Sequence, residues 1–167
     1  MKNSNKTELM FIDKRHESFY LDQMKKVKDD VYHRALFYAL GINEDIRQHI
    51  DEIYDFQDQL IIPDAVNRAW QTSGSLKATR IAFNLYANCV PEGDVETVET
   101  LNEAVDEANT IAKYTVEEIF DCPYAPFFWQ AVQLRYPEFA VYKKSPMEKL
   151  WEKAGKEDEN GPYRENE

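Results

Sequence analysis

Residues 72–80, TSGSLKATR, combine a glycine-containing turn with two cations, Lys77 and Arg80. A turn that leads into a helix points several backbone N–H groups at one spot, where an anion is favoured. The segment matches neither the G-x-x-x-x-G-K-[ST] pattern nor the G-x-G-x-x-G pattern of nucleotide-binding loops. Ordinary capping of the helix by Thr72 or a following serine explains the same residue types, so both interpretations stay open.

The residues that would meet a phosphate-bearing or nucleotide-like ligand belong to this turn and to the polar stripe of the helix after it. They are Trp70, Ser73, Gly74, Ser75, Lys77, Arg80 and Asn84. At 100° per residue the polar residues of the helix fall on one narrow stripe, so we expect a buried helix whose cations need partners. Those partners are either protein groups, with Asp55 as a candidate for Arg80, or an external anion.

The histidines indicate a functional site less strongly than the turn at residues 72–80 does. His16, His33 and His49, with Asp55, could form the site of a metal-dependent hydrolase only if the fold brings them together, because none has the spacing of HExxH. A buried, hydrogen-bonded imidazole is the ordinary alternative for His33. We therefore expect no catalytic residue, no bound metal and no cofactor, and we favour a protein that is not an enzyme.

Acidic residues are concentrated in one part of the chain. The net charge is −11, yet residues 90–121 hold ten acids against Lys113 alone, and most of the chain is nearly neutral. Such a segment suits a protein partner with a basic surface, although a solvated helix face is the plainer explanation. The acids expected to face that partner are Glu96, Glu99, Glu103, Asp106 and Glu107. Direct nucleic-acid binding is disfavoured because long Lys/Arg clusters are missing.

Two cysteines, Cys89 and Cys122, are too few to indicate a disulfide framework, and small-hydrophobe packing is their ordinary role. The N-terminal residues MKNSNKTELM lack the apolar core of a signal peptide. Apolar runs are also shorter than the roughly 18 residues that a membrane span needs. We expect a cytoplasmic protein that does not bind membranes.

Helix signals dominate the chain and must position these residues. We expect an all-α, irregular, compact multi-helix domain built around helices near 31–40, 75–88 and 124–136, with one short hairpin near 56–62 as an addition. The expected domain covers residues 1–154 with an acidic insert at about 92–121, followed by a disordered acidic tail at 155–167.

Capping residues predict where the helices begin and end. Asp13, Asp29 or Asp30, and Asn43 precede apolar periodic segments, and Thr115 with Glu118 and Ser145 with Glu148 have capping-box spacing. Gly41 is expected as a C-cap. The last helix should end near Ala154 and turn Leu150 and Trp151 inward.

The strings DDVYHRALFYALG, YDF, WQT with S-x-K-x-T-R-x-A-F-N-L, and YAPFFWQAVQLRYP resemble an uncharacterised family of small proteins from Gram-positive bacteria and their phages or integrating elements. The resemblance covers about residues 10–140. It implies an origin and an approximate extent, and it carries no activity, cofactor or catalytic residue. The acidic insert and the tail are expected to lie outside the pattern.

Three hypotheses follow. The first is a non-enzymatic binding protein from a phage or mobile element that inhibits or modulates a host defence protein. The second is a small-ligand binder that sequesters a phosphate-bearing or nucleotide-like molecule at residues 72–80. The third is the metal-dependent hydrolase.

Overall fold

The computed structural model describes residues 9–88, 90, 109, 111–141 and 143–159. Contacts divide the chain into two units, unit 1 (Met1–Pro137) and unit 2 (Glu138–Glu167). The domain boundary expected at residue 154 stays a prediction.

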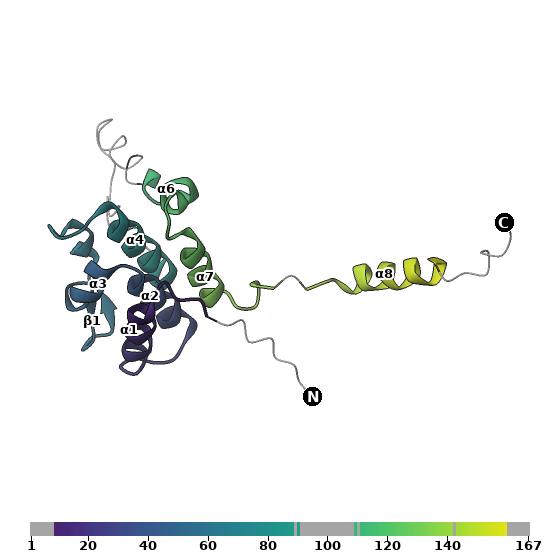
Figure 1. Ribbon diagram of the computed structural model, residues 1–167, viewed down its shortest axis with the longest axis horizontal. Coiled ribbons are helices and arrows are strands. Elements are labelled where there is room, and N and C mark those ends of the chain that lie inside the picture. Colours follow the sequence, from purple (N-terminus) through teal and green to yellow (C-terminus); the bar gives the residue numbers. More distant parts are fainter. Residues whose placement is uncertain (1–8, 89, 91–108, 110, 142, 160–167) are drawn as a thin grey trace. The chain divides into compact units, whose positions relative to one another are not determined.

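The elements of unit 1 follow the chain in a simple order (Figure 1). They are α1 (Lys14–Met24), α2 (Val31–Gly41), α3 (Glu44–Gln48), the 3-10 helix η1 (Ile50–Glu52), β1 (Tyr54–Asp55), β2 (Leu60–Ile61), the 3-10 helix η2 (Pro63–Asn67), α4 (Ser73–Ala87), α6 (Val116–Phe120) and α7 (Ala125–Arg135). Unit 2 contains α8 (Pro146–Glu159). The expected all-α class with one short hairpin is confirmed.

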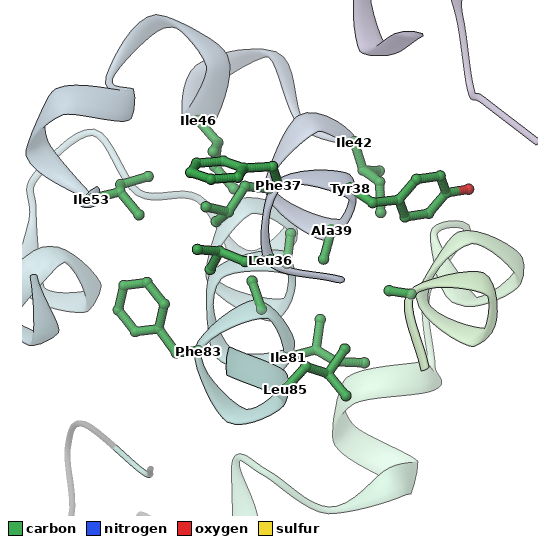
Figure 2. Close-up of a cluster of buried hydrophobic side chains, with 14 of the residues drawn as sticks. Leu36, Phe37, Tyr38, Ala39, Ile42, Ile46, Ile53, Ile81, Phe83 and Leu85 are labelled. Atoms are coloured by element: carbon green, nitrogen blue, oxygen red, sulfur yellow. The ribbon is translucent and has the colours of Figure 1, made fainter. Parts of the chain in front are cut away.

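Helix α2 forms the centre of unit 1. It packs against α1, α4 and α7, and α4 also packs against α7. The six residues from Ala35 to Leu40 are fully buried, which explains why α2 is apolar on nearly every side. Figure 2 shows Leu36 of α2 in one cluster with Ile81 and Phe83 of α4. The three helices expected to form the core therefore do so.

Side-chain caps begin the helices where the sequence predicts them. Asp13 Oδ1 accepts from the His16 N–H at 2.7 Å before α1, and Asp30 caps α2. Thr115 Oγ1 accepts from the Glu118 N–H at 3.3 Å before α6. These bonds satisfy N–H groups that the first helical turn leaves without an intrahelical acceptor.

The expected C-cap role of Gly41 is wrong. Gly41 is the last residue of α2, and none of the described glycines has a positive φ. A Cβ at this position would lie 2.7 Å from His16 Cδ2 and 2.8 Å from Phe19 Cδ1. Glycine is therefore needed here because α1 approaches the end of α2 too closely for a side chain.

The hairpin pairs Tyr54 with Ile61 and Asp55 with Leu60. Asp55 Oδ1 accepts from the N–H groups of Gln57 at 2.8 Å and Asp58 at 3.1 Å, so it shapes the turn. Asp55 thus caps the hairpin turn and does not form the ion pair with Arg80 that the sequence suggested.

The Arg34 guanidinium binds the Asp29 carboxylate. Its Nε and Nη2 donate to the two Asp29 carboxylate oxygens at 2.6 and 2.8 Å. The pairing is bidentate, and the hydrogen bonds from Arg34 hold the pKa of Asp29 below its usual value.

Helix α8 is longer than expected. It continues through Gly155 to Glu159, because Lys and Glu favour helix and one glycine costs only about 1 kcal/mol. Leu150 and Trp151 of unit 2 are 60% and 69% exposed, and the expectation that they turn inward stays a prediction. The capping box is present, since Glu148 N–H donates to Ser145 Oγ at 3.1 Å and Ser145 N–H donates to Glu148 Oε2 at 2.7 Å.

Candidate functional site

The turn before α4 is closed by a capping box. The Ser75 N–H donates to Thr72 Oγ1 at 3.3 Å, and the Thr72 N–H donates to Ser75 Oγ at 2.7 Å. The buried Ser75 hydroxyl also donates to Gln71 Oε1 at 2.6 Å. The hydrogen-bonding groups of Ser75 are thus directed into the protein, as the capping interpretation expects.

An open cleft of about 670 Å³ adjoins this turn. It is lined by Ser73, Gly74, Lys77, Glu118, Asp121, Cys122, Pro123 and Tyr124. Lys77 Nζ donates to the Asp121 carbonyl oxygen at 3.2 Å and lies 3.7 Å from Glu118 Oε1. Because two carboxylates share the cleft with a single cation, its charge favours an anion less than the sequence suggests.

Three of the seven predicted ligand residues, Ser73, Gly74 and Lys77, meet at this cleft. Trp70 does not line it. The indole of Trp70 stacks on the His49 ring, with centroids 4.4 Å apart and planes 12° apart, and donates to Glu52 Oε2 at 3.3 Å.

Arg80 and Asn84 also lie away from the cleft. Arg80 is 8% exposed, and its Cζ lies 5.9 Å from the centre of the Tyr114 ring, within range of a cation–π contact. Asn84 is exposed and borders a separate, mainly apolar pocket of about 160 Å³. The pocket is lined by Ile81, Asn84, Leu85, Tyr114, Thr115, Val116, Ile119, Phe120 and Val132.

The three histidines occupy separate environments. His16 is fully buried, its Nε2 donates to the Tyr38 carbonyl oxygen at 2.8 Å, and its Nδ1 accepts from the Ile12 N–H at 3.3 Å. Burial lowers the pKa of His16 to about 4, so the imidazole is neutral at pH 7. His49 Nδ1 donates to the Asp45 carbonyl oxygen at 2.8 Å. Among the described residues, no group of three or more His, Cys, Asp and Glu side chains could hold a metal ion.

His33 belongs to a polar network that the sequence analysis missed. Asp30 Oδ1 lies 2.9 Å from His33 Nδ1, and the Tyr54 hydroxyl lies 3.1 Å from His33 Nε2. The Tyr86 hydroxyl lies 3.4 Å from the same nitrogen and donates to the Gln59 carbonyl oxygen at 2.9 Å. The spacing of Asp30 and His33 on one helix face is the signal that could have indicated the first contact.

This Asp–His–Tyr arrangement holds the hairpin against α2 and α4. His33 is 6% exposed and Tyr54 is 1% exposed, and burial raises the pKa of the Tyr54 hydroxyl well above its usual value. A neutral, buried tyrosine is a hydrogen-bond donor that keeps the imidazole satisfied. The network therefore supports the buried-imidazole alternative for His33.

Two groups of predictions fall outside the described residues. They concern Cys89 and the partner-facing acids Glu96, Glu99, Glu103, Asp106 and Glu107. Cys122 is described as a half-buried free thiol whose Sγ lies 3.5 Å from the Ile119 carbonyl oxygen.

Comparison with models of known protein families gives a match. The model of a family of unknown function, DUF6075, matches residues 6–148. The chain belongs to this family. The DUF6075 match extends beyond the expected range of 10–140 and includes residues 92–121, so the prediction that the acidic insert lies outside the family pattern is wrong, whereas the tail does lie outside it. Neither the curated proteins nor the solved structures contain a match to this chain.

The DUF6075 match includes α1 through α7 and ends in the first turn of α8. Over the part of the chain that the structure describes, every helix is too short or too polar to cross a membrane.

Proposed function

We propose that the chain is a non-enzymatic binding protein that acts through protein–protein contact. The observation that carries this proposal is the apolar stripe of α8. Met147, Leu150 and Trp151 are 55%, 60% and 69% exposed, and they lie on one face of the helix because their spacing is i, i+3 and i+4. Amphipathic helices that dock in the groove of a partner protein do so through residues at this spacing.

The proposal includes the origin that the family resemblance implies, namely a phage or mobile element. The proposed partner is a host defence protein, and a basic surface on that partner meets the acidic segment. Complementary charge would speed association and align the two proteins.

Photo-crosslinking tests the proposal with two surfaces and one control. A benzophenone amino acid at position 150 or 103 in the full chain should give a defined cross-linked protein band in the host cell. The same group at Leu60, which is 59% exposed in the hairpin, should not. Equal, diffuse labelling from all three positions would contradict a protein-binding function.

A small-ligand binder is the second candidate, favoured by the meeting of Ser73, Gly74 and Lys77 at one open cleft. Thermal-shift measurements with nucleotides, cyclic nucleotides and inorganic phosphate test it. Stabilisation that disappears in K77M would support this function over the first, because the methionine keeps the length of the side chain without its charge.

A further inference from the structure

We infer that Arg135 forms a binding site for a carboxylate group of a peptide ligand. The site lies where the C-terminal ends of α4 and α7 meet the first turn of α2, and it consists of Arg135, Tyr32 and Tyr136. It uses neither α8 nor the acidic segment, on which the proposed function rests. Either proposal can therefore be wrong without the other.

One nitrogen of the Arg135 guanidinium is held by the fold. Arg135 is the last residue of α7, and its Nε donates to the Leu85 carbonyl oxygen at 2.9 Å. Leu85 lies in the last turn of α4, which ends at Ala87. The negative ends of the two helices also favour a cation here. This contact by itself is the ordinary role of an arginine that ties helix ends together.

Two tyrosine rings pack against the same guanidinium. Its Cζ lies 3.8 Å from the centre of the Tyr32 ring and 4.6 Å from the centre of the Tyr136 ring. Both distances are within the range of cation–π contacts. An arginine that is stacked in this way is pre-organised, so it loses little side-chain freedom when its remaining N–H groups bind a ligand.

The other two nitrogens of Arg135 are available. Within the part of the chain that the structure describes, Nη1 and Nη2 make no hydrogen bond or ion pair. Neither is among the fully buried polar atoms without a hydrogen bond, so both nitrogens reach solvent. Other arginines use these groups within the fold. Arg34 Nη2 donates to Asp29 at 2.8 Å, and Arg47 Nη1 donates to the Gly41 carbonyl oxygen at 2.7 Å.

The shape and charge of the site indicate a carboxylate. A guanidinium presents a planar fork of N–H groups that matches the two oxygens of a carboxylate. The single positive charge of Arg135 balances a monoanion, whereas phosphate groups are typically bound by a cluster of arginines. Tyr32 is 44% exposed and offers apolar surface beside the fork. Tyrosine and arginine also contribute strongly to binding energy at protein interfaces, which favours a peptide over a small free anion.

NMR spectroscopy of the isotope-labelled full chain tests the inference with three blocked tripeptides. N-acetyl-glycyl-glutamyl-glycinamide carries a side-chain carboxylate, N-acetyl-triglycine carries a terminal carboxylate, and N-acetyl-glycyl-glutaminyl-glycinamide is the neutral control. At equal ionic strength, the carboxylate peptides should shift the Arg135 Nε–H signal severalfold more than the neutral peptide does. The Arg34 Nε–H signal is the internal control and should move little, because Asp29 already occupies its fork.

The outcomes of this titration separate the possible ligands. A selective shift with either carboxylate peptide supports the inference, and comparison of the two peptides shows which carboxylate is preferred. An unchanged Arg135 signal, or equal shifts at Arg135 and Arg34, would overturn it. A larger response to inorganic phosphate than to the carboxylate peptides would also overturn it.

Three variants distinguish ligand binding from the helix tie. R135K keeps the positive charge but lacks the planar fork, so the ring signals of Tyr32 should no longer respond to the glutamyl peptide. R34K is the matched control and should leave that response intact. Y32L keeps the bond from Arg135 to Leu85, and it should reduce the shift of the Arg135 Nε–H signal severalfold because the stacked ring is lost. A full response in folded R135K, or in Y32L, would contradict the site.

Discussion

His16 is a histidine that the fold keeps uncharged. Its ring donates to one backbone carbonyl and accepts from one backbone N–H, so a second proton would break the contact with the Ile12 N–H. Burial accordingly lowers the pKa of His16 from 6.5 to about 4. Because the unfolded chain binds this proton more readily, the free energy of unfolding should fall as the pH drops from 6.5 towards 4.

The first prediction concerns this pH window. The loss attributable to His16 should reach roughly 3 kcal/mol near pH 4. Urea denaturation at a series of pH values measures it. H16Q should reduce the slope between pH 6.5 and 4, while H49Q, which leaves His16 in place, should keep it. Equal slopes in all three proteins would show that His16 does not cause the dependence.

Two helical glycines provide a matched pair of substitutions. Alanine at position 41 would place its Cβ 2.7 Å from His16 Cδ2, whereas at position 74 the nearest atom is Tyr124 Cε2 at 3.3 Å. G41A should destabilise the protein by about 1 to 2 kcal/mol, because overpacking outweighs the gain in helix propensity. G74A should be nearly neutral, since the tyrosine ring can shift slightly. Denaturant midpoints measure both, and a stabilised G41A would contradict the close approach of α1.

At the scale of the elements, the stability of helix α4 depends on the capping box at its first turn. Thr72 and Ser75 satisfy each other's backbone N–H groups. T72A should cost about 1 kcal/mol of stability, and T72S should recover most of it by restoring the hydroxyl. Chemical denaturation measures the difference; equal losses in the two variants would show that the methyl group matters and the cap does not.

Most elements of unit 1 could be predicted because their signals are local. Asp13, Asp30 and Thr115 cap helices by bonding to nearby N–H groups, and an apolar sequence on nearly every side of α2 indicates burial. The role of Gly41 could not be predicted, because it depends on contact with His16 in another helix.

The candidate site was predicted only in part. Ser73, Gly74 and Lys77 are near one another in sequence, so one helix end brings them together. Glu118 and Asp121, at the C-terminal end of the acidic segment, join them together with Tyr124, and this long-range contact changes the charge of the cleft. No local pattern carries such information.

At the scale of the whole molecule, the chain divides at Pro137 into units with separate contacts. A chain ending at Pro137 should therefore keep the thermal midpoint of unit 1 within about 2 °C of the full chain, because the core helices α1, α2, α4 and α7 all precede that residue. Circular dichroism melting measures this. A large decrease in the midpoint would show that residues 138–167 contribute to the stability of unit 1.

The close approach of α1 at Gly41 also constrains how this family can evolve. Since the Cβ of any larger residue would meet His16 and Phe19, positions 16, 19 and 41 should vary together among relatives. A relative with alanine or serine at position 41 should carry a smaller side chain at position 16 or 19. A change at position 16 would also remove the neutral imidazole, so in such relatives the acid sensitivity of the fold should be lost together with the glycine.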